Sequence, residues 1–199
     1  MAVNRDPVLK KCRSLGLDPV YLGIDKKSRR GAPNGRRPGK KSEYALQLRE
    51  KQKAKFIYGV LEKPFHNYYE KAKQMKGMTG ENLMILLESR LDNVIFRAGF
   101  ARTRKEARQI VDHKQLTVNG KCINIPSYRV SAGDVIEIKE KCKGSARYAE
   151  IREITGGRLV PAWLDADLEN LTVKVVELPK RDEIDVPVDE MLIVELYSK

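Results

Sequence analysis

The sequence predicts an α+β protein: a small all-helical domain, then a module of two helices packed on an antiparallel sheet, with a basic N-terminal arm. Apolar residues recur at helical spacing between residues 42 and 76, which predicts the helical domain. A tight turn at Asn119-Gly120 separates two short β-prone runs, which predicts the sheet. Clustered Lys and Arg before residue 42 predict the arm.

Charge is distributed unevenly along the 199 residues. The chain carries 39 Lys and Arg against 27 Asp and Glu, a net charge of +12. Residues 1–55 hold 16 basic and 5 acidic residues (net +11), residues 56–149 hold 17 and 10 (net +7), and residues 150–199 hold 6 and 12 (net −6). This balance favours a polyanionic partner for the basic part of the chain.

A membrane surface is the competing polyanion, but no apolar run approaches the roughly 20 residues of a span, and no basic helix has a broad apolar face. Nucleic acid is therefore the predicted partner, and no membrane contact is expected. The first twelve residues lack the apolar core of a signal peptide, so we expect a cytoplasmic protein. Three cysteines, odd in number and far apart, argue against a disulfide framework.

Residues 1–41 are predicted to form a basic extended arm. Basic clusters alternate there with Gly, Pro and Asn, so the segment buries too little apolar surface to fold well alone. A solvated, disordered tail is one interpretation. We favour an arm that orders on RNA, because each neutralised phosphate releases condensed counterions. The predicted RNA contacts in the arm are Lys10, Lys11, Arg13, Arg29, Arg30, Arg36, Arg37, Lys40 and Lys41.

Residues 42–88 are predicted to form the helical domain. Ser42 can cap a helix that runs to residue 58, where Gly59 suits its end. On this helix Arg49 and Lys53 lie one turn apart and are predicted to contact RNA. A second helix fits residues 64–76, whose aromatic stripe we interpret as core in preference to a base-stacking surface.

A predicted α/β domain of residues 89–179 contains a central module, residues 89–138. The module opens with an S-x-x-D pattern at Ser89, which is typical of a helix start. Thr103 and Glu106 then form a T-x-x-E capping box, which predicts a second short helix. The module therefore begins with two capped helices.

Four cations surround the helix start predicted at Thr103. They are Arg102, Arg104, Lys105 and Arg108. A helix start presents free backbone amides and the positive end of the helix dipole, so stability alone favours acidic residues there. Cations at this point indicate a phosphate site, with a solvated cationic face as the alternative.

The hairpin turn at Asn119-Gly120 is typical of a two-residue type I′ connection. Further strands are expected at residues 129–130 and 135–138, which completes two helices on an antiparallel sheet. If the hairpin folds back toward the basic helix start, Asn119 and Lys121 line a groove for a phosphate backbone. These features make the central module a predicted RNA-binding module.

The patterns weaken after residue 143, although Trp163 is predicted to anchor a core and residues 171–178 alternate like a strand. The last apolar run, residues 189–199, suits a strand about as well as a helix. Residues 182–199 carry a net charge of −5, so we expect this tail to face a protein and not RNA. The predicted protein-interface residues are Leu192, Glu195 and Tyr197.

Recognisable catalytic and metal-binding motifs are absent from the sequence. The chain has two histidines, His66 and His113, and neither has a Cys or carboxylate partner at a familiar spacing. It has no C-x-x-C pair for zinc, no phosphate-cradling G-x-x-x-x-G-K-[ST] loop and no G-x-S-x-G elbow. We therefore expect neither an enzyme nor a cofactor.

The pattern of residues 89–138 resembles the small RNA-binding fold shared by ribosomal protein four of the small subunit, certain pseudouridine synthases and the tail of some tyrosyl-tRNA synthetases. The flanking segments distinguish these options. The segments SEYALQLREKQKAKFIYGVLEKPF, ENLMILLESRLDNVIFRAGFARTRKEARQ, VNGKCINIPSYRV and LIVELYSK resemble the bacterial form of the small-subunit ribosomal protein four family. The likeness covers essentially everything from residue 42 onward.

This resemblance implies a non-catalytic primary binder of small-subunit ribosomal RNA at a multi-helix junction, which nucleates subunit assembly and contributes to translational accuracy. It also implies ribosomal protein five as a neighbour and a place on the ribosome near the channel where messenger RNA enters. In this family the chain end packs back on the first helical domain, so residues 180–199 are expected to complete residues 42–88. The family favours a helix for the last run.

One departure from the family concerns zinc. Many relatives carry a four-cysteine zinc knot near the N-terminus, whereas Cys12 is the one cysteine of that region here. We therefore expect no zinc and a looser arm.

Two other functions are compatible with the central module. The first is an RNA-modifying enzyme that uses the module for targeting, but neither flank has the length or the candidate groups of a catalytic domain. The second is a free-standing RNA-binding regulator or rescue factor.

Overall fold

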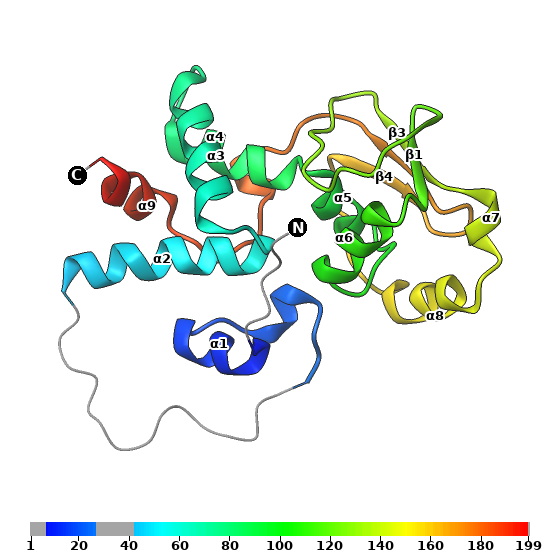
Figure 1. The fold of residues 1–199 in the computed structure, drawn as a ribbon, viewed down its shortest axis with the longest axis horizontal. Helices are drawn as coiled ribbons and strands as arrows, with labels where there is room; N and C mark the ends of the chain where they lie inside the picture. The colour runs from blue at the N-terminus through cyan, green and yellow to red at the C-terminus, as the bar shows by residue number, and fades with distance from the viewer. Residues whose placement is uncertain (1–6, 27–41, 199) are drawn as a thin grey trace. The chain divides into compact units, whose positions relative to one another are not determined.

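The computed structural model describes residues 7–26 and 42–198 (Figure 1). The described elements form two compact units. The first unit comprises the segments before residue 85 and after residue 184, and its elements are helical. The second unit, residues 85–184, combines helices with a five-stranded antiparallel sheet. The predicted α+β class is therefore confirmed.

The first unit begins with helix α1 (Val8–Leu15) and a 3-10 turn, η1 (Pro19–Leu22). The extended arm predicted for residues 1–41 is therefore wrong over residues 7–26. The physical reason is burial: Cys12 and Leu15 are at most 6% exposed, so the segment contributes to a core that its composition did not indicate. Residues 27–41 lie outside the described residues.

Arg49 attaches α1 to the rest of this unit. Its Nε and Nη2 donate hydrogen bonds of 3.0 and 2.8 Å to the carbonyl oxygen of Leu15. Gly16 follows with a φ of 67°, and a Cβ at this position would collide with the Arg49 guanidinium. The left-handed backbone conformation explains why glycine ends α1.

Helix α2 (Glu43–Tyr58) confirms the predicted caps. The Ser42 hydroxyl accepts from the Ala45 amide at 3.3 Å, and Gly59 adopts the left-handed conformation with a φ of 64°. Helix α3 (Glu62–Gln74) begins and ends two residues earlier than predicted. Its stripe is core as expected, with Phe65 fully buried.

The last apolar run forms helix α9 (Glu190–Tyr197), as the family resemblance implied. The Asp189 carboxylate caps it by accepting two backbone amide hydrogen bonds, which decides between helix and strand. Helix α9 packs against α2 (Figure 1). The buried Gln47 amide donates to Glu195 Oε2 at 3.0 Å across this contact.

Glu62 links α9 to α2 and α3. Its carboxylate accepts hydrogen bonds from Lys51 Nζ (2.8 Å), Lys55 Nζ (2.6 Å) and the Tyr197 hydroxyl (2.9 Å). Partial burial raises the pKa of Glu62, but these hydrogen bonds outweigh burial and hold the pKa at about 2. The carboxylate therefore stabilises the folded chain most when it is ionised.

We expect Glu62→Gln to lower the melting temperature at pH 7 and to lower it less at pH 3. The folded pKa of about 2 lies below the ordinary value of 4.5. The stabilisation is therefore complete above pH 4.5 and is lost as the pH falls toward 2. Thermal unfolding at both pH values measures the difference, with Glu70→Gln, an exposed position on α3, as the control. An equal loss at both pH values would contradict the role of this carboxylate.

The second unit places its helices against the sheet. The boundary between the two units falls within helix α4 (Thr79–Glu88). The other helices of the second unit are α5 (Leu91–Arg97), α6 (Arg104–Asp112), α7 (Glu140–Lys143), α8 (Ala146–Thr155) and the 3-10 turn η2 (Arg181–Glu183). The strands are β1 (Leu116–Val118), β2 (Lys121–Cys122), β3 (Val135–Ile138), β4 (Leu164–Asp167) and β5 (Thr172–Val175), in the order β2-β1-β3-β5-β4. The hydrophobic core joins residues of α5, α6 and α8 to the sheet and includes Trp163, which confirms that predicted anchor.

The start of α5 differs from the prediction. Ser89 does not cap this helix; Arg90 occupies the N-cap and pairs with the Asp92 carboxylate at 2.6 Å. The strand predicted at residues 129–130 is a single bridge between Arg90 and Arg129. Both differences have one cause, because backbone carbonyls of residues 126 and 128 accept from the first amides of α5 and so satisfy the helix start.

Candidate nucleic-acid interface

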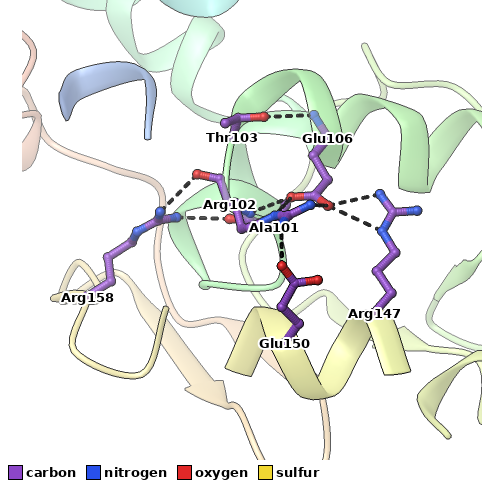
Figure 2. Close-up of polar contacts among 7 residues, drawn as sticks. All are labelled: Ala101, Arg102, Thr103, Glu106, Arg147, Glu150 and Arg158. Atoms are coloured by element: carbon purple, nitrogen blue, oxygen red, sulfur yellow. Dashed lines mark hydrogen bonds and ion pairs between the residues drawn. The ribbon is translucent and has the colours of Figure 1, made fainter. Parts of the chain in front are cut away.

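Helix α6 begins at Arg104, directly after the predicted cap (Figure 2). The Thr103 hydroxyl accepts from the Glu106 amide at 3.2 Å. The Glu106 carboxylate accepts from the Arg102 amide at 2.8 Å, one residue before the position that a regular capping box uses. The helix start is therefore confirmed, with its reciprocal hydrogen bond shifted by one residue.

Arg102, the residue before the cap of α6, is held by two carboxylates (Figure 2). Its guanidinium contacts Glu150 Oε1 at 2.8 Å and Glu106 Oε1 at 3.2 Å, and the hydrogen bond and charge of Glu106 raise the pKa of Arg102. Arg147 donates to the same Glu106 oxygen. The Arg102 side chain remains 39% exposed, so its position is fixed while it stays accessible to solvent.

Glu106 is the anionic centre of this network. Burial raises its pKa, but hydrogen bonds from Arg102 and Arg147 outweigh burial and hold the pKa below its ordinary value. Glu106 thus orders two guanidinium groups beside the first turn of α6, and together with Glu150 it balances their charge.

Arg104, at the start of α6, is buried and does not lie on the protein surface. It is 8% exposed, its Nε donates to Asn93 Oδ1 at 2.8 Å, and its guanidinium carbon lies 4.3 Å from the centre of the Phe96 ring. This burial is a correction to its predicted position at the surface. We therefore leave Arg104 out of the proposed phosphate contacts.

Lys105 and Arg108 complete the accessible part of the helix start. Lys105 is exposed, and the Arg108 side chain is 22% exposed with its Nε 3.8 Å from Asp112. We call Arg102, Lys105 and Arg108 the α6 cation group. Arg102 precedes the cap, and Lys105 and Arg108 lie within the first five residues of a helix whose start presents backbone amides and the positive end of the dipole.

The cations predicted in the first unit have varied surroundings. On α1, Lys10 is exposed, whereas Lys11 and Arg13 are partly buried. The Arg49 donors hold the Leu15 carbonyl, and Lys53 Nζ contacts Glu50 at 2.6 Å. Outside the described residues lie Arg29, Arg30, Arg36, Arg37, Lys40 and Lys41.

The hairpin forms as predicted, because Asn119 and Gly120 have φ values of 49° and 76° and the adjacent residues pair. However, the Asn119 amide is used inside the sheet: Nδ2 donates to Asp134 at 2.8 Å and Oδ1 accepts from the Val135 amide at 2.9 Å. Asn119 therefore stabilises the turn, and both polar atoms of its side chain already form hydrogen bonds within the protein. Lys121 is exposed.

The predicted protein-interface residues make contacts within the chain. Glu195 accepts from Gln47, and the Tyr197 ring lies 4.7 Å from that of Tyr69 between ring centres. Leu192 is partly buried in the same helix. These contacts help to dock α9 on its own unit.

Sequence reasoning missed Arg158. Its guanidinium donates to the backbone carbonyls of Phe96 (2.9 Å), Ala101 (3.0 Å) and Arg102 (3.0 Å), which lie at and after the end of α5. The last two contacts are drawn in Figure 2. The local sequence offers one weak signal, since a cation follows a Gly-Gly break. Its three acceptors are more than fifty positions away, so no local pattern could identify them.

Within residues 7–26 and 42–198, no group of three or more His, Cys, Asp and Glu side chains could hold a metal ion. In the same residues, no helix has the length and hydropathy of a membrane span.

The chain matches known proteins over its whole length. A family model described as "S4 domain" matches residues 89–136, and one described as "Ribosomal protein S4/S9 N-terminal domain" matches residues 3–88. The protein of Lachnospira eligens named "Small ribosomal subunit protein uS4" is 75% identical over 199 residues, which is 100% of both chains.

Proteins of the same name in other bacteria are also similar. That of Nocardioides sp. is 54% identical over 202 residues with 100% of both chains covered. That of Caldicellulosiruptor saccharolyticus is 58% identical over 166 residues, covering 83% of this chain and 80% of the relative. These are names of ribosomal components, as the family resemblance implied. The chain therefore belongs to the uS4 family of small ribosomal subunit proteins.

Proposed function

We propose that this protein binds small-subunit ribosomal RNA directly at a junction of several helices, as a structural, non-catalytic component of the cytoplasmic ribosome. In this role it nucleates assembly of the small subunit and contributes to translational accuracy. The relatives named above support the ribosomal part of the proposal. The observation that carries the RNA-binding part is the α6 cation group at a capped helix start.

The proposed mechanism is electrostatic and architectural. Arg102, Lys105 and Arg108 neutralise phosphates of neighbouring RNA strands, while the backbone amides at the start of α6 donate hydrogen bonds to a phosphate oxygen. Glu106 and Glu150 hold the Arg102 guanidinium in place, so less side-chain freedom is lost on binding. Because the major groove of A-form RNA is too narrow for side chains, shape is recognised more than sequence.

Lys105→Ala is expected to weaken binding to a fragment of small-subunit ribosomal RNA and to reduce the slope of log K against log salt by about one. Adding Arg108→Ala is expected to reduce this slope by about one more, because each lost phosphate contact lowers the number of counterions that binding releases. Filter binding over a range of KCl concentrations measures both quantities. Lys174→Ala, an exposed cation on β5, is the control. An unchanged slope in the double variant would place the RNA site elsewhere.

We also propose a protein-facing role for the acidic tail. Residues 182–199 carry a net charge of −5, which disfavours contact with RNA and suits a basic neighbour such as ribosomal protein five. We expect cross-linking of assembled small subunits to join this tail to a protein. Cross-links from the tail to ribosomal RNA alone would contradict this part of the proposal. We also propose that the protein lies near messenger RNA, at the channel where messenger RNA enters the ribosome.

Sedimentation separates the proposed function from a free-standing regulator. In a gradient of cell lysate, a ribosomal component comigrates stoichiometrically with small subunits. A soluble, substoichiometric pool would favour the regulator.

A further inference from the structure

The loop between α5 and α6 is held by donors from the end of α8 and the turn that follows it. Arg158 donates to three carbonyl oxygens of this region, those of Phe96, Ala101 and Arg102, at 2.9 to 3.0 Å. Figure 2 shows the contacts to Ala101 and Arg102. Arginine suits this task because its planar guanidinium presents several donors in a fixed fork, whereas a lysine ammonium is a single point.

Thr155 adds a fourth contact to the same loop. Its hydroxyl lies 2.7 Å from the carbonyl oxygen of Gly99, and the residue is 1% exposed. Gly99 has a φ of 82°, and a Cβ on it would press against Leu168 at 3.1 Å, so the loop passes close to the unit's core here. The loop backbone is therefore fixed at successive points along its length.

The backbone of Arg102 is held from two sides. Arg158 donates to its carbonyl oxygen at 3.0 Å, and Glu106 accepts from its amide at 2.8 Å. The next residue is Thr103, the cap of α6. Any change in the loop is therefore passed directly to the helix start.

Phe96 connects Arg158 to the buried side of α6. The guanidinium carbon of Arg158 lies 4.5 Å from the centre of the Phe96 ring, and that of Arg104 lies 4.3 Å from it. Arg104 is the first residue of α6 and also donates to Asn93. Arg158 thus supports the helix start through the backbone of the preceding loop and through the Phe96 ring that it shares with Arg104.

We infer that Arg158 is a positioning residue for the RNA site: it orders the loop that presents the α6 cation group and does not itself neutralise a phosphate. This inference rests on the proposed RNA-binding function. Its donors are directed at carbonyl oxygens of the chain, so its contribution depends on the shape of the guanidinium and not on its charge alone.

Two substitutions separate these roles. Arg158→Lys keeps the positive charge but loses the planar set of guanidinium donors. Arg158→Ala loses both the charge and the donors. We expect both variants to bind a small-subunit ribosomal RNA fragment about tenfold more weakly, the scale of one or two lost hydrogen bonds. The salt slope of Arg158→Lys is expected to stay that of the unmodified chain. Arg152→Lys, on α8 and six positions before Arg158, is the control and is expected to bind normally.

Hydrogen exchange without RNA gives a second readout. We expect faster amide exchange across residues 98–105 in Arg158→Lys, with unchanged protection in the sheet. Thr155→Val, which removes the hydroxyl and keeps the volume, is expected to act in the same direction, and it replaces the arginine variants if they fail to fold.

Three outcomes would overturn the inference. Normal binding by Arg158→Lys, together with a salt slope lowered by about one in Arg158→Ala, would make Arg158 a direct phosphate contact. Unchanged exchange across residues 98–105 would show that the loop does not depend on Arg158. If the unmodified chain showed no salt-dependent binding to the fragment, the proposed function would fail and this inference with it.

Discussion

Replacing Glu88 with alanine is expected to lower the free energy of unfolding of the second unit by about 3–5 kcal/mol, the cost of removing one partner of a buried ion pair. Glu88 ends α4, is 1% exposed and accepts from Arg97 Nη2 at 2.9 Å. The Asn93 amide donates to it as well. Alanine would leave a guanidinium and an amide to find new partners in a closed site.

Denaturant unfolding followed by fluorescence measures this loss, because Trp163 is the single tryptophan of the sequence and is 1% exposed in the core of the same unit. Glu153→Ala, an exposed glutamate on α8, is the control and is expected to change the free energy of unfolding by about 0.5 kcal/mol or less. Equal losses in the two variants would show that the Glu88 network adds no stability.

Leu116→Ala is expected to cost about 2–5 kcal/mol of unfolding free energy, because it removes buried methyl groups and leaves a cavity. Leu116 lies in β1 and is 0% exposed. The matched substitution is Leu159→Ala, at a position that is 94% exposed, where we expect about 0.5 kcal/mol or less. The same fluorescence measurement compares the two. A small loss at Leu116 would mean that the sheet contributes little to this core.

The elements that depend on local hydrogen bonds could be predicted from the sequence. The caps at Ser42 and Thr103 and the Asn119-Gly120 turn each join groups no more than three residues apart. Ser89 has the same local pattern and still does not act as a cap. There a segment more than thirty positions away supplies the carbonyls, and such a tertiary partner has no signature in the local pattern.

The sequence predicted only part of the candidate site, because the burial of each side chain depends on tertiary contacts. The sequence located a group of cations around a helix start, but it could not show that Arg104 is buried against Phe96 and Asn93 while Lys105 is exposed. Neighbouring positions on a helix differ in burial according to what packs on each face. The role of Arg158 depends entirely on tertiary contacts, so it became visible only in the structure.

The contact between α2 and α9 has a consequence for the order in which the protein folds during its own synthesis. The second unit is continuous in sequence, residues 85–184, so its core can form before α9 has been translated. The first unit joins Gln47 to Glu195 across 148 positions, and closing so long a loop carries an entropic cost. While the chain is being made, the face of α2 that receives α9 therefore stays open until α9 has left the ribosome.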